Sequence, residues 1–308
     1  MSQALVWFVR QLQSLVVAIR PHQWTKNLVV LAALIFAERL YDPHSLMLAL
    51  GAFGVFCALA GAIYLLNDLA DLEGDRQHPV KRMRPIASGA LSPRVALAAA
   101  AVLGTLGLVG GLAIGTPFAA VSLTYLVAMT AYSFHLKNVV ILDVLIVAFG
   151  FVLRAIAGAV AIGVVFSNWL LICTLLLALF LALAKRRQEL TFLAREAAEH
   201  RRILGEYSPY LLDQMIAVVT ASTLISYALY TLAPETVDRF GTDRLIWTLP
   251  FVLYGIFRYL YLVHQKEEGG NPTRVLLDDR PILVTVALWA ATVITLIYHG
   301  SRSSLTLP

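Results

Sequence analysis

Long apolar segments alternate with short polar connections along most of the 308 residues. Several of these segments approach or exceed the roughly 18 residues that a helix needs to cross a bilayer. Residues 46–66 show the pattern most clearly, because no charged residue interrupts them. The pattern predicts about nine membrane-spanning helices. Their approximate ranges are 23–40, 46–66, 95–113, 117–134, 139–163, 167–184, 212–232, 245–263 and 281–299.

The composition supports this interpretation. The chain is 59% hydrophobic and its mean hydropathy is +0.76, whereas a soluble protein is nearer half apolar. No polar segment is long enough to form a second domain, so residues 1–308 are predicted to form a single integral membrane domain. Its fold class is an all-α polytopic bundle. Residues 1–22 mix apolar positions with polar ones such as Arg10 and Gln11, and we expect them to lie at the membrane interface.

The lysines and arginines are concentrated in every second connection between the predicted spans. Most of the 24 basic residues fall on the side that also holds the N-terminus, and the positive-inside rule places that side in the cytoplasm. We therefore expect a multi-pass protein of the plasma (inner) membrane, with cytoplasmic catalytic loops at about 67–94 and 185–211. Because the charge follows topology, it does not indicate nucleic-acid binding. Cys57 and Cys173 lie within apolar runs and imply no disulfide.

The second apolar segment runs into a charged stretch, YLLNDLADLEGDRQHPVKRMRP, at residues 64–85. Asp68, Asp71 and Asp75 stand at i, i+3 and i+7, so they share a face if the helix continues. Carboxylates at that spacing repel one another unless a cation lies between them, and oxygen ligands suit Mg²⁺. Asn67 stands beside them as a further polar ligand. The alternative is a solvated charged loop.

Basic residues that suit phosphate oxygens follow or face this stretch. They are Lys81, Arg82 and Arg84 in the same loop, Lys26 at the start of the first span, Lys137 after the fourth, and Lys185 and Arg186 after the sixth. Tyr132 and Glu189 accompany the last two groups and are candidates for binding substrate. Each also has a structural alternative as an anchor at the membrane interface.

Arg154 lies deep in the fifth span, eleven residues after Asp143, so the two share a helical face. An ionisable side chain at that depth is costly and indicates function. Arg154 is expected to reach a bound anion, or else to pair with a carboxylate of another span.

Four motifs together resemble the UbiA superfamily of intramembrane prenyltransferases: RPHQWTKN, NDLADLEGD, KRMRP and YSFHLK. The resemblance covers nearly the whole chain and implies a UbiA-like bundle. Within the superfamily, the combination with KRRQEL is similar to the phosphoribosyltransferase branch. That branch implies Mg²⁺-dependent transfer of 5-phosphoribosyl from 5-phosphoribosyl-1-diphosphate to a polyprenyl (decaprenyl) phosphate. The product would serve cell-wall arabinan synthesis, and the enzyme would be a homo-oligomer, a trimer.

One position departs from most of the superfamily. A second aspartate-rich motif is usual after the sixth span, but this chain has KRRQE there, with Glu189 as its only acid. Cations at this position suit the additional phosphate of a phosphoribosyl donor. We expect catalytic roles for Asp68, Asp71, Asp75, Lys137 and Arg154, the three aspartates being the metal ligands. We expect substrate contacts from Lys26, Asn67, Lys81, Arg82, Arg84, Tyr132, Lys185, Arg186 and Glu189.

Two other functions compete with this interpretation. A UbiA-type prenyltransferase would move a polyprenyl group from its diphosphate to an aromatic or haem acceptor with the same first motif, but the acid-poor second cluster is against it. A lipid or solute transporter would use Asp143 and Arg154 to line a pathway. Transporters, however, place polar groups near the bilayer midplane, whereas these motifs gather at one side.

Overall fold

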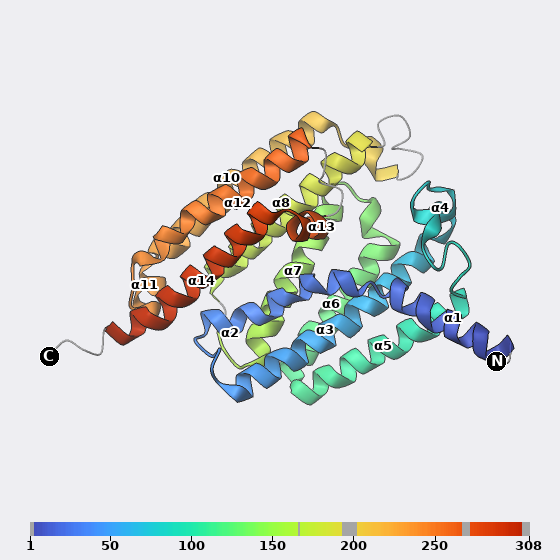
Figure 1. The fold of residues 1–308 in the computed structure, drawn as a ribbon, viewed down its shortest axis with the longest axis horizontal. Coiled ribbons are helices and arrows are strands. Elements are labelled where there is room, and N and C mark those ends of the chain that lie inside the picture. The colour runs from blue at the N-terminus through green and yellow to red at the C-terminus, as the bar shows by residue number, and fades with distance from the viewer. Residues whose placement is uncertain (1–2, 166, 193–201, 267–271, 304–308) are drawn as a thin grey trace.

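The computed structural model describes residues 3–165, 167–192, 202–266 and 272–303, and the regular structure in these ranges is entirely helical (Figure 1). Within them, eight helices are long and apolar enough to cross a membrane. Most of each lies in α3 (Pro43–Ala70), α5 (Pro93–Ile114), α6 (Thr116–Phe134), α7 (Leu142–Ala161), α8 (Asn168–Phe192), α10 (Pro209–Leu232), α12 (Leu249–Gln265) and α14 (Arg280–Ser303). The predicted polytopic helical bundle is confirmed.

The first expected span takes another form. Its residues make a 3-10 helix, η1 (Pro21–Leu31), followed by the short α2 (Ala32–Phe36), instead of one α-helix over 23–40. A 3-10 helix rises about 2 Å per residue against 1.5 Å for an α-helix, so the two pieces together reach about 30 Å. That is close to the thickness of the hydrocarbon core. With η1 and α2 beside α3 and α7, the predicted count of about nine is close to the observed one.

The remaining helices connect or flank the spanning ones. They are α1 (Gln3–Ala18), α4 (Leu72–Gln77), η2 (Lys81–Met83), η3 (Leu136–Asn138), η4 (Arg202–Glu206), α11 (Pro234–Phe240), η5 (Arg244–Thr248) and α13 (Pro272–Asp278). Local chemistry sets several boundaries. Pro43 begins α3, and the Asp42 side chain accepts hydrogen bonds from the His44 and Ser45 amides at 3.2 and 3.3 Å, so it caps the helix.

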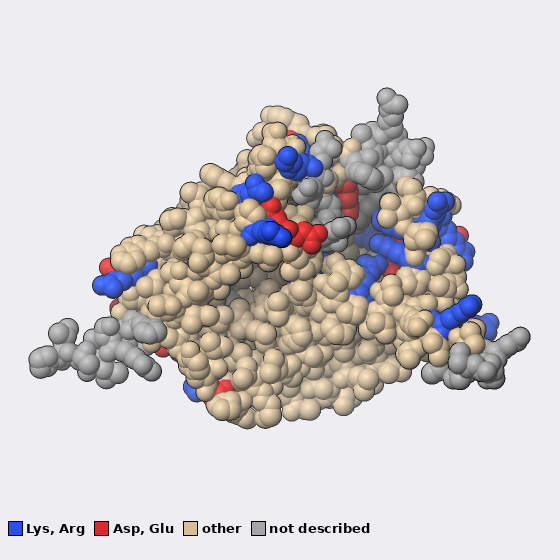
Figure 2. Space-filling view, viewed as in Figure 1, with Lys and Arg blue, Asp and Glu red and all other residues tan. Residues whose placement is uncertain are grey.

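Two large apolar cores hold the bundle together. One joins η1, α3, α6 and α7 around Phe56, Leu59 and Tyr125. The other joins α8, α10, α12 and neighbouring helices around Phe180 and Tyr259. The visible face of the molecule is mostly uncharged, and its lysines, arginines, aspartates and glutamates collect toward the ends (Figure 2). This is the charge distribution of a protein whose middle lies in lipid.

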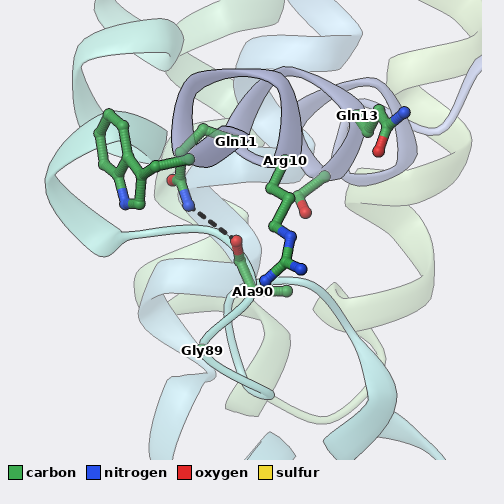
Figure 3. Close-up of a pocket in the computed structure, with 7 residues that line it drawn as sticks. Arg10, Gln11, Gln13, Gly89 and Ala90 are labelled. Carbon is green, nitrogen blue, oxygen red and sulfur yellow. Dashed lines mark hydrogen bonds between the residues drawn. The ribbon is translucent and has the colours of Figure 1, made fainter. Parts of the chain in front are cut away.

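Helix α1 is fastened to the loop before α5 by one side chain. Nε2 of Gln11 donates to the Ala90 carbonyl at 2.9 Å (Figure 3). The Ser92 amide donates to Oε1 of Gln11 at 3.0 Å. Below this contact Ile86 and Leu91 are buried against α1. A groove of about 390 Å³ runs between α1 and this loop and is lined by Trp7, Arg10, Gln11, Gln13, Ser14, Gly89 and Ala90. The loop downstream of Arg84 is therefore held by α1.

Candidate active site

The aspartates of the first motif lie on two helices. Helix α3 ends at Ala70, Asp71 occupies the junction, and α4 begins at Leu72. The condition under which the three aspartates would share one helical face, a helix that continues past the apolar run, is therefore not met. The apolar run that keeps α3 inside the bundle stops before Asn67, and beyond it the side chains follow polar partners. Asn67 shows this locally, because its Nδ2 donates to Oδ2 of Asp71 at 3.1 Å.

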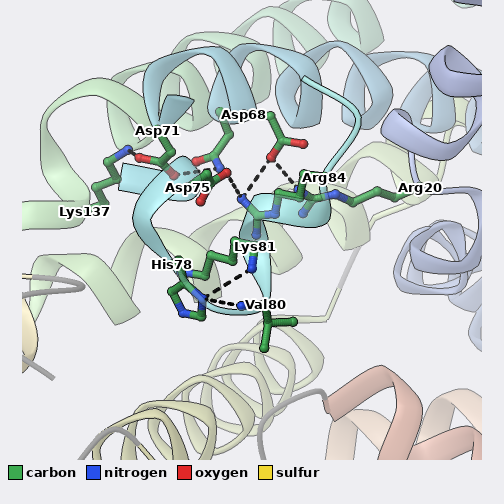
Figure 4. Close-up of polar contacts among 10 residues, drawn as sticks. Arg20, Asp68, Asp71, Asp75, His78, Val80, Lys81, Arg84 and Lys137 are labelled. Carbon is green, nitrogen blue, oxygen red and sulfur yellow. Dashed lines mark hydrogen bonds and ion pairs between the residues drawn. The ribbon is translucent and has the colours of Figure 1, made fainter. Parts of the chain in front are cut away.

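Arg84 joins the two helices of the motif. Its Nη1 lies 3.1 Å from Oδ1 of Asp68 and 2.6 Å from Oδ2 of Asp75 (Figure 4). Both carboxylates are almost fully buried, with 2% and 3% of their surface exposed. Burial raises the pKa of the Asp75 carboxyl, although the charge of Arg84 opposes the shift. Two aspartates seven residues apart thus share one cation.

Arg20 completes this group and was missing from the predicted site. Its guanidinium pairs with Asp68 and lies 5.0 Å from the centre of the Tyr64 ring. Its backbone is left-handed, with φ 53° and ψ 63°, which is uncommon for a residue other than glycine. The sequence carries a signal for this role, since Arg20 opens the RPHQWTKN motif.

Lys137 reaches the same network from η3, where it pairs with Asp71. His78 shapes the basic loop, the loop that carries Lys81, Arg82 and Arg84. Its Nδ1 accepts hydrogen bonds from the Val80 and Lys81 amides at 3.1 and 3.3 Å. Lys81 itself lies on η2 and has further interactions. Arg82 is exposed and its side chain has no partner among the described residues. The structure therefore brings Asn67, Lys137 and Arg84 to the aspartates but leaves Arg82 at the surface.

The second predicted group centres on Arg186 of α8. Its Nε donates to Oδ2 of Asp143 at 2.6 Å, its Nη1 donates to Glu189, and Tyr132 lies near it. Lys185 lies 3.6 Å from Glu189 and is partly exposed. Neighbouring Arg187 turns away and pairs with Asp213 of α10 instead. Arg186 is thus a buried cation with two carboxylate partners, an arrangement that sequence spacing alone did not indicate.

Arg154 is buried among neutral groups. Its three nitrogens donate to Oδ1 of Asn27 at 2.8 Å, the Gly150 carbonyl at 2.8 Å and the Tyr125 hydroxyl at 2.6 Å. The guanidinium also lies 4.7 Å from the centre of the Tyr125 ring. The structural alternative, a carboxylate partner, is not found among the described residues. Its role toward an anion stays a prediction.

Lys26 connects the two groups. It precedes Asn27 on η1 and lies within electrostatic range of Lys185, Arg154 and Arg20. No carboxylate pairs with it in the described part of the chain. Lys26 therefore lies within electrostatic range of basic residues from both groups, with its amine not paired to a carboxylate of the described residues.

The three aspartates and the cations paired with them, Arg20, Arg84 and Lys137, form the first group of the site. The carboxylate oxygens of this group suit a divalent cation. Asp68, Asp71 and Asp75 supply the hard oxygens that Mg²⁺ prefers, and Oδ2 of Asp68 is buried without a hydrogen-bond partner. A buried carboxylate oxygen without a partner is costly, so it is suited to an additional cation. No three acidic, histidine or cysteine side chains of the described residues converge tightly enough to form a metal cage. Arg20, Lys137 and Arg84 pair with one oxygen each of Asp68, Asp71 and Asp75.

Residues 27–277 match the model of the UbiA prenyltransferase family. The chain belongs to the UbiA prenyltransferase family. The family resemblance read from RPHQWTKN, NDLADLEGD, KRMRP and YSFHLK is therefore confirmed.

Curated relatives agree with the branch that the motifs indicated. The chain is 35% identical over 287 residues to the decaprenyl-phosphate phosphoribosyltransferase of Corynebacterium glutamicum, covering 91% of this chain and 86% of the relative. It is 34% identical over 297 residues to that of Mycolicibacterium smegmatis, covering 93% of each. Both relatives are enzymes by name, so the resemblance to the phosphoribosyltransferase branch is confirmed as well.

A solved structure shows the same fold. A UbiA homolog from Archaeoglobus fulgidus, bound to GPP and Mg²⁺, superposes with a TM-score of 0.69 at 20% identity, over 93% of this chain and 99% of the other. The predicted UbiA-like architecture is thereby confirmed. Residues 193–201 of the catalytic loop predicted at 185–211 lie outside the residues that the structure describes.

Proposed function

We propose that this UbiA-family protein transfers the 5-phosphoribosyl group of 5-phosphoribosyl-1-diphosphate to a polyprenyl phosphate, releasing diphosphate. The observation that carries the proposal is the pairing of two unlike groups at one end of the bundle. The first is rich in carboxylates and the second is centred on the cations Lys26, Lys185 and Arg186. The relatives named above, about 35% identical over most of the chain, support the same donor and acceptor.

The two groups match the two ends of the donor. We assign the diphosphate to the first group, where Arg20, Arg84 and Lys137 supply cations beside the aspartates. We assign the 5-phosphate to the second group. A prenyl diphosphate has no second anion that could bind at Lys185 or at the remaining nitrogen of Arg186, whereas the donor's 5-phosphate could. The lipid tail of the acceptor would lie along the apolar surface between spanning helices.

Mg²⁺ held by Asp68, Asp71 and Asp75 would neutralise charge on the departing diphosphate. In the reaction the bond between ribose C1 and the diphosphate oxygen breaks, and its electron pair leaves with diphosphate. An oxygen of the acceptor phosphate forms the new bond to C1. Because that oxygen is already anionic, no general base is needed. Displacement at C1 inverts the anomeric centre, and catalysis rests on positioning and charge.

The donor is tested with the purified protein in lipid nanodiscs. Labelled 5-phosphoribosyl-1-diphosphate, a polyprenyl phosphate and Mg²⁺ are expected to give a labelled lipid, and labelled prenyl diphosphate with an aromatic acceptor is expected to give none. The reverse pattern would identify a prenyltransferase. In a parallel assay with the protein in sealed lipid vesicles, label crossing the bilayer without a product would indicate transport.

The metal role is tested with Asp68→Ala and Asp71→Ala. Each is expected to lose turnover by at least about 10²-fold, because buried Asp68 and partly exposed Asp71 hold the cation and the basic partners together. Glu73→Ala is the matched control, since Glu73 lies in the same motif but is exposed and pairs only with exposed Arg76. Full activity of the Asp68 variant at saturating Mg²⁺ would refute the proposed metal site.

A further inference from the structure

Tyr207 occupies an unusual position behind the second group. It lies between η4 and α10 with only 5% of its surface exposed, and its hydroxyl donates to Oδ1 of Asp143 at 2.7 Å. The same hydroxyl accepts a hydrogen bond from the Ile141 amide at 2.8 Å. One phenol oxygen therefore joins the segment after α8 to the start of α7.

The backbone at this contact is strained. Ile141 has φ 69° and ψ −43°, a conformation that a β-branched residue rarely adopts. Such strain persists only when the surroundings enforce it, and it gathers at functional positions. The conformation turns the Ile141 amide toward Tyr207 and places Asp143 in the first turn of α7 with no exposed surface.

Asp143 in turn fixes Arg186. Its Oδ1 is bound by Tyr207 and its Oδ2 accepts from Nε of Arg186 at 2.6 Å. Glu189 holds Nη1 of the same guanidinium. Nε and Nη1 of Arg186 both have carboxylate partners. The third guanidinium nitrogen, Nη2, makes no hydrogen bond to any described residue. A planar guanidinium fixed on two sides offers its remaining donor in one direction.

From this chain of contacts we infer that Asp143 and Tyr207 are positioning residues that hold Arg186 for the 5-phosphate of the donor. The inference rests on the proposed function, because it assigns Arg186 to the sugar phosphate and not to the diphosphate. Tyr207 touches no substrate itself. It keeps Asp143 from turning, and Asp143 keeps the open nitrogen of Arg186 aimed at the phosphate. The positioning determines specificity for a donor that is phosphorylated at both ends.

Burial and the hydrogen bond to Asp143 raise the pKa of Tyr207 to about 12. The phenol is therefore protonated throughout the physiological range and always donates to the carboxylate. Phenylalanine keeps the ring but removes this donor, and it leaves both the Ile141 amide and one oxygen of Asp143 without a partner. A buried polar group left unpaired is destabilising, and the strained turn at Ile141 loses a hydrogen bond that stabilises it.

The experiment compares Tyr207→Phe with Tyr210→Phe, because Tyr210 is three residues away and 74% exposed. Tyr207→Phe is expected to raise KM for 5-phosphoribosyl-1-diphosphate by at least about fivefold. The inhibition constant of inorganic diphosphate, which needs only the first group, should stay within about twofold of wild type, as should kcat. Tyr210→Phe should match wild type throughout.

An unchanged KM in Tyr207→Phe, or an equal loss of affinity for diphosphate, overturns the inference. A double-mutant cycle with Arg186→Lys isolates the positioning role, since the effect of Tyr207→Phe should disappear once the guanidinium is gone. If Tyr207→Phe does not fold, Asp143→Asn takes its place with the same expected and overturning results. Wild-type protein that does not use the donor refutes the proposed function instead, so the two failures are distinct.

Discussion

Gly158 of α7 lies directly against the backbone of Val30 in η1. A Cβ added to Gly158 would stand 2.0 Å from the Val30 carbonyl oxygen, well inside van der Waals contact. The neighbouring atoms are backbone and have no rotamer to change. Close approach of this kind is the usual reason for glycine between membrane helices, and here it places η1, with Lys26 and Asn27, beside Arg154.

Gly158→Ala is therefore expected to destabilise the protein and to displace η1. Overpacking in a tight interior costs about 1–3 kcal/mol, which would appear as a lower melting temperature in detergent and reduced turnover. Gly54→Ala on α3 is the control, because nothing lies within 4 Å of its added Cβ. Equal melting temperatures for the two variants would mean that α7 and η1 do not pack as described.

Gln11 offers a test of how α1 supports the basic loop. Gln11→Ala removes both hydrogen bonds to the backbone around Ala90, each worth about 0.5–1.5 kcal/mol. We expect a higher KM for the donor, because the loop that carries Arg84 loosens. Amide hydrogen exchange at residues 89–92 should accelerate. Gln13→Ala is matched in helix, residue type and groove, yet no hydrogen bond of Gln13 is present in the described structure, so it should behave as wild type. If Gln11→Ala and Gln13→Ala had the same KM for the donor, α1 would not hold the loop that carries Arg84.

Arg154→Lys distinguishes a structural role from anion binding. Lysine cannot satisfy Asn27, Gly150 and Tyr125 together, so the loss of hydrogen bonds is expected to lower the melting temperature. If Arg154 acts only through these hydrogen bonds, KM changes by less than about threefold. Arg94→Lys is the control, because Arg94 is exposed and its side chain makes no hydrogen bond or ion pair with the described residues. A KM increase of about tenfold at unchanged melting temperature would instead show that Arg154 binds a substrate anion.

Asp279 at the start of α14 predicts a pH dependence of stability. Its carboxylate lies 2.9 Å from Nη2 of Arg258 and accepts from the Ile282 amide at 3.0 Å, and the hydrogen bond to Arg258 lowers its pKa. A lowered folded-state pKa contributes stability above the unfolded value of about 4, and this contribution is lost as pH falls through the folded-state pKa. Asp279→Asn should lower the melting temperature at pH 7 by about 2 °C or more.

The difference between wild type and Asp279→Asn should shrink as the pH falls from about 5 to 3. Asp243→Asn serves as a control, because Asp243 is exposed and makes no hydrogen bond within the described residues. A difference that stays constant over this pH range would contradict the assigned ion pair.

Much of the architecture could be predicted from the sequence, because the thickness of the bilayer sets how long an apolar segment must be to span it. An apolar run such as residues 46–66 has one low-energy solution in lipid, a helix with its backbone groups paired internally. The first span was different, since RPHQWTKN contains polar residues and a proline, and 3-10 geometry stretched a short segment to the required length. The aspartate motif was recognised from its spacing, although the helix breaks at Asp71.

Sequence determined the family, the bundle and the chemical types at the site, because these depend on local periodicity and on residues close together in the chain. Tertiary structure alone decided the partners. Arg20 meets Asp68, Lys137 meets Asp71, and Arg186 meets Asp143 across 43 to 66 positions. Tyr207 carried no sequence signal, since one tyrosine among 12 is ordinary until folding buries it against a carboxylate. A buried charge takes whichever partner packing brings within reach, and that depends on how the helices cross.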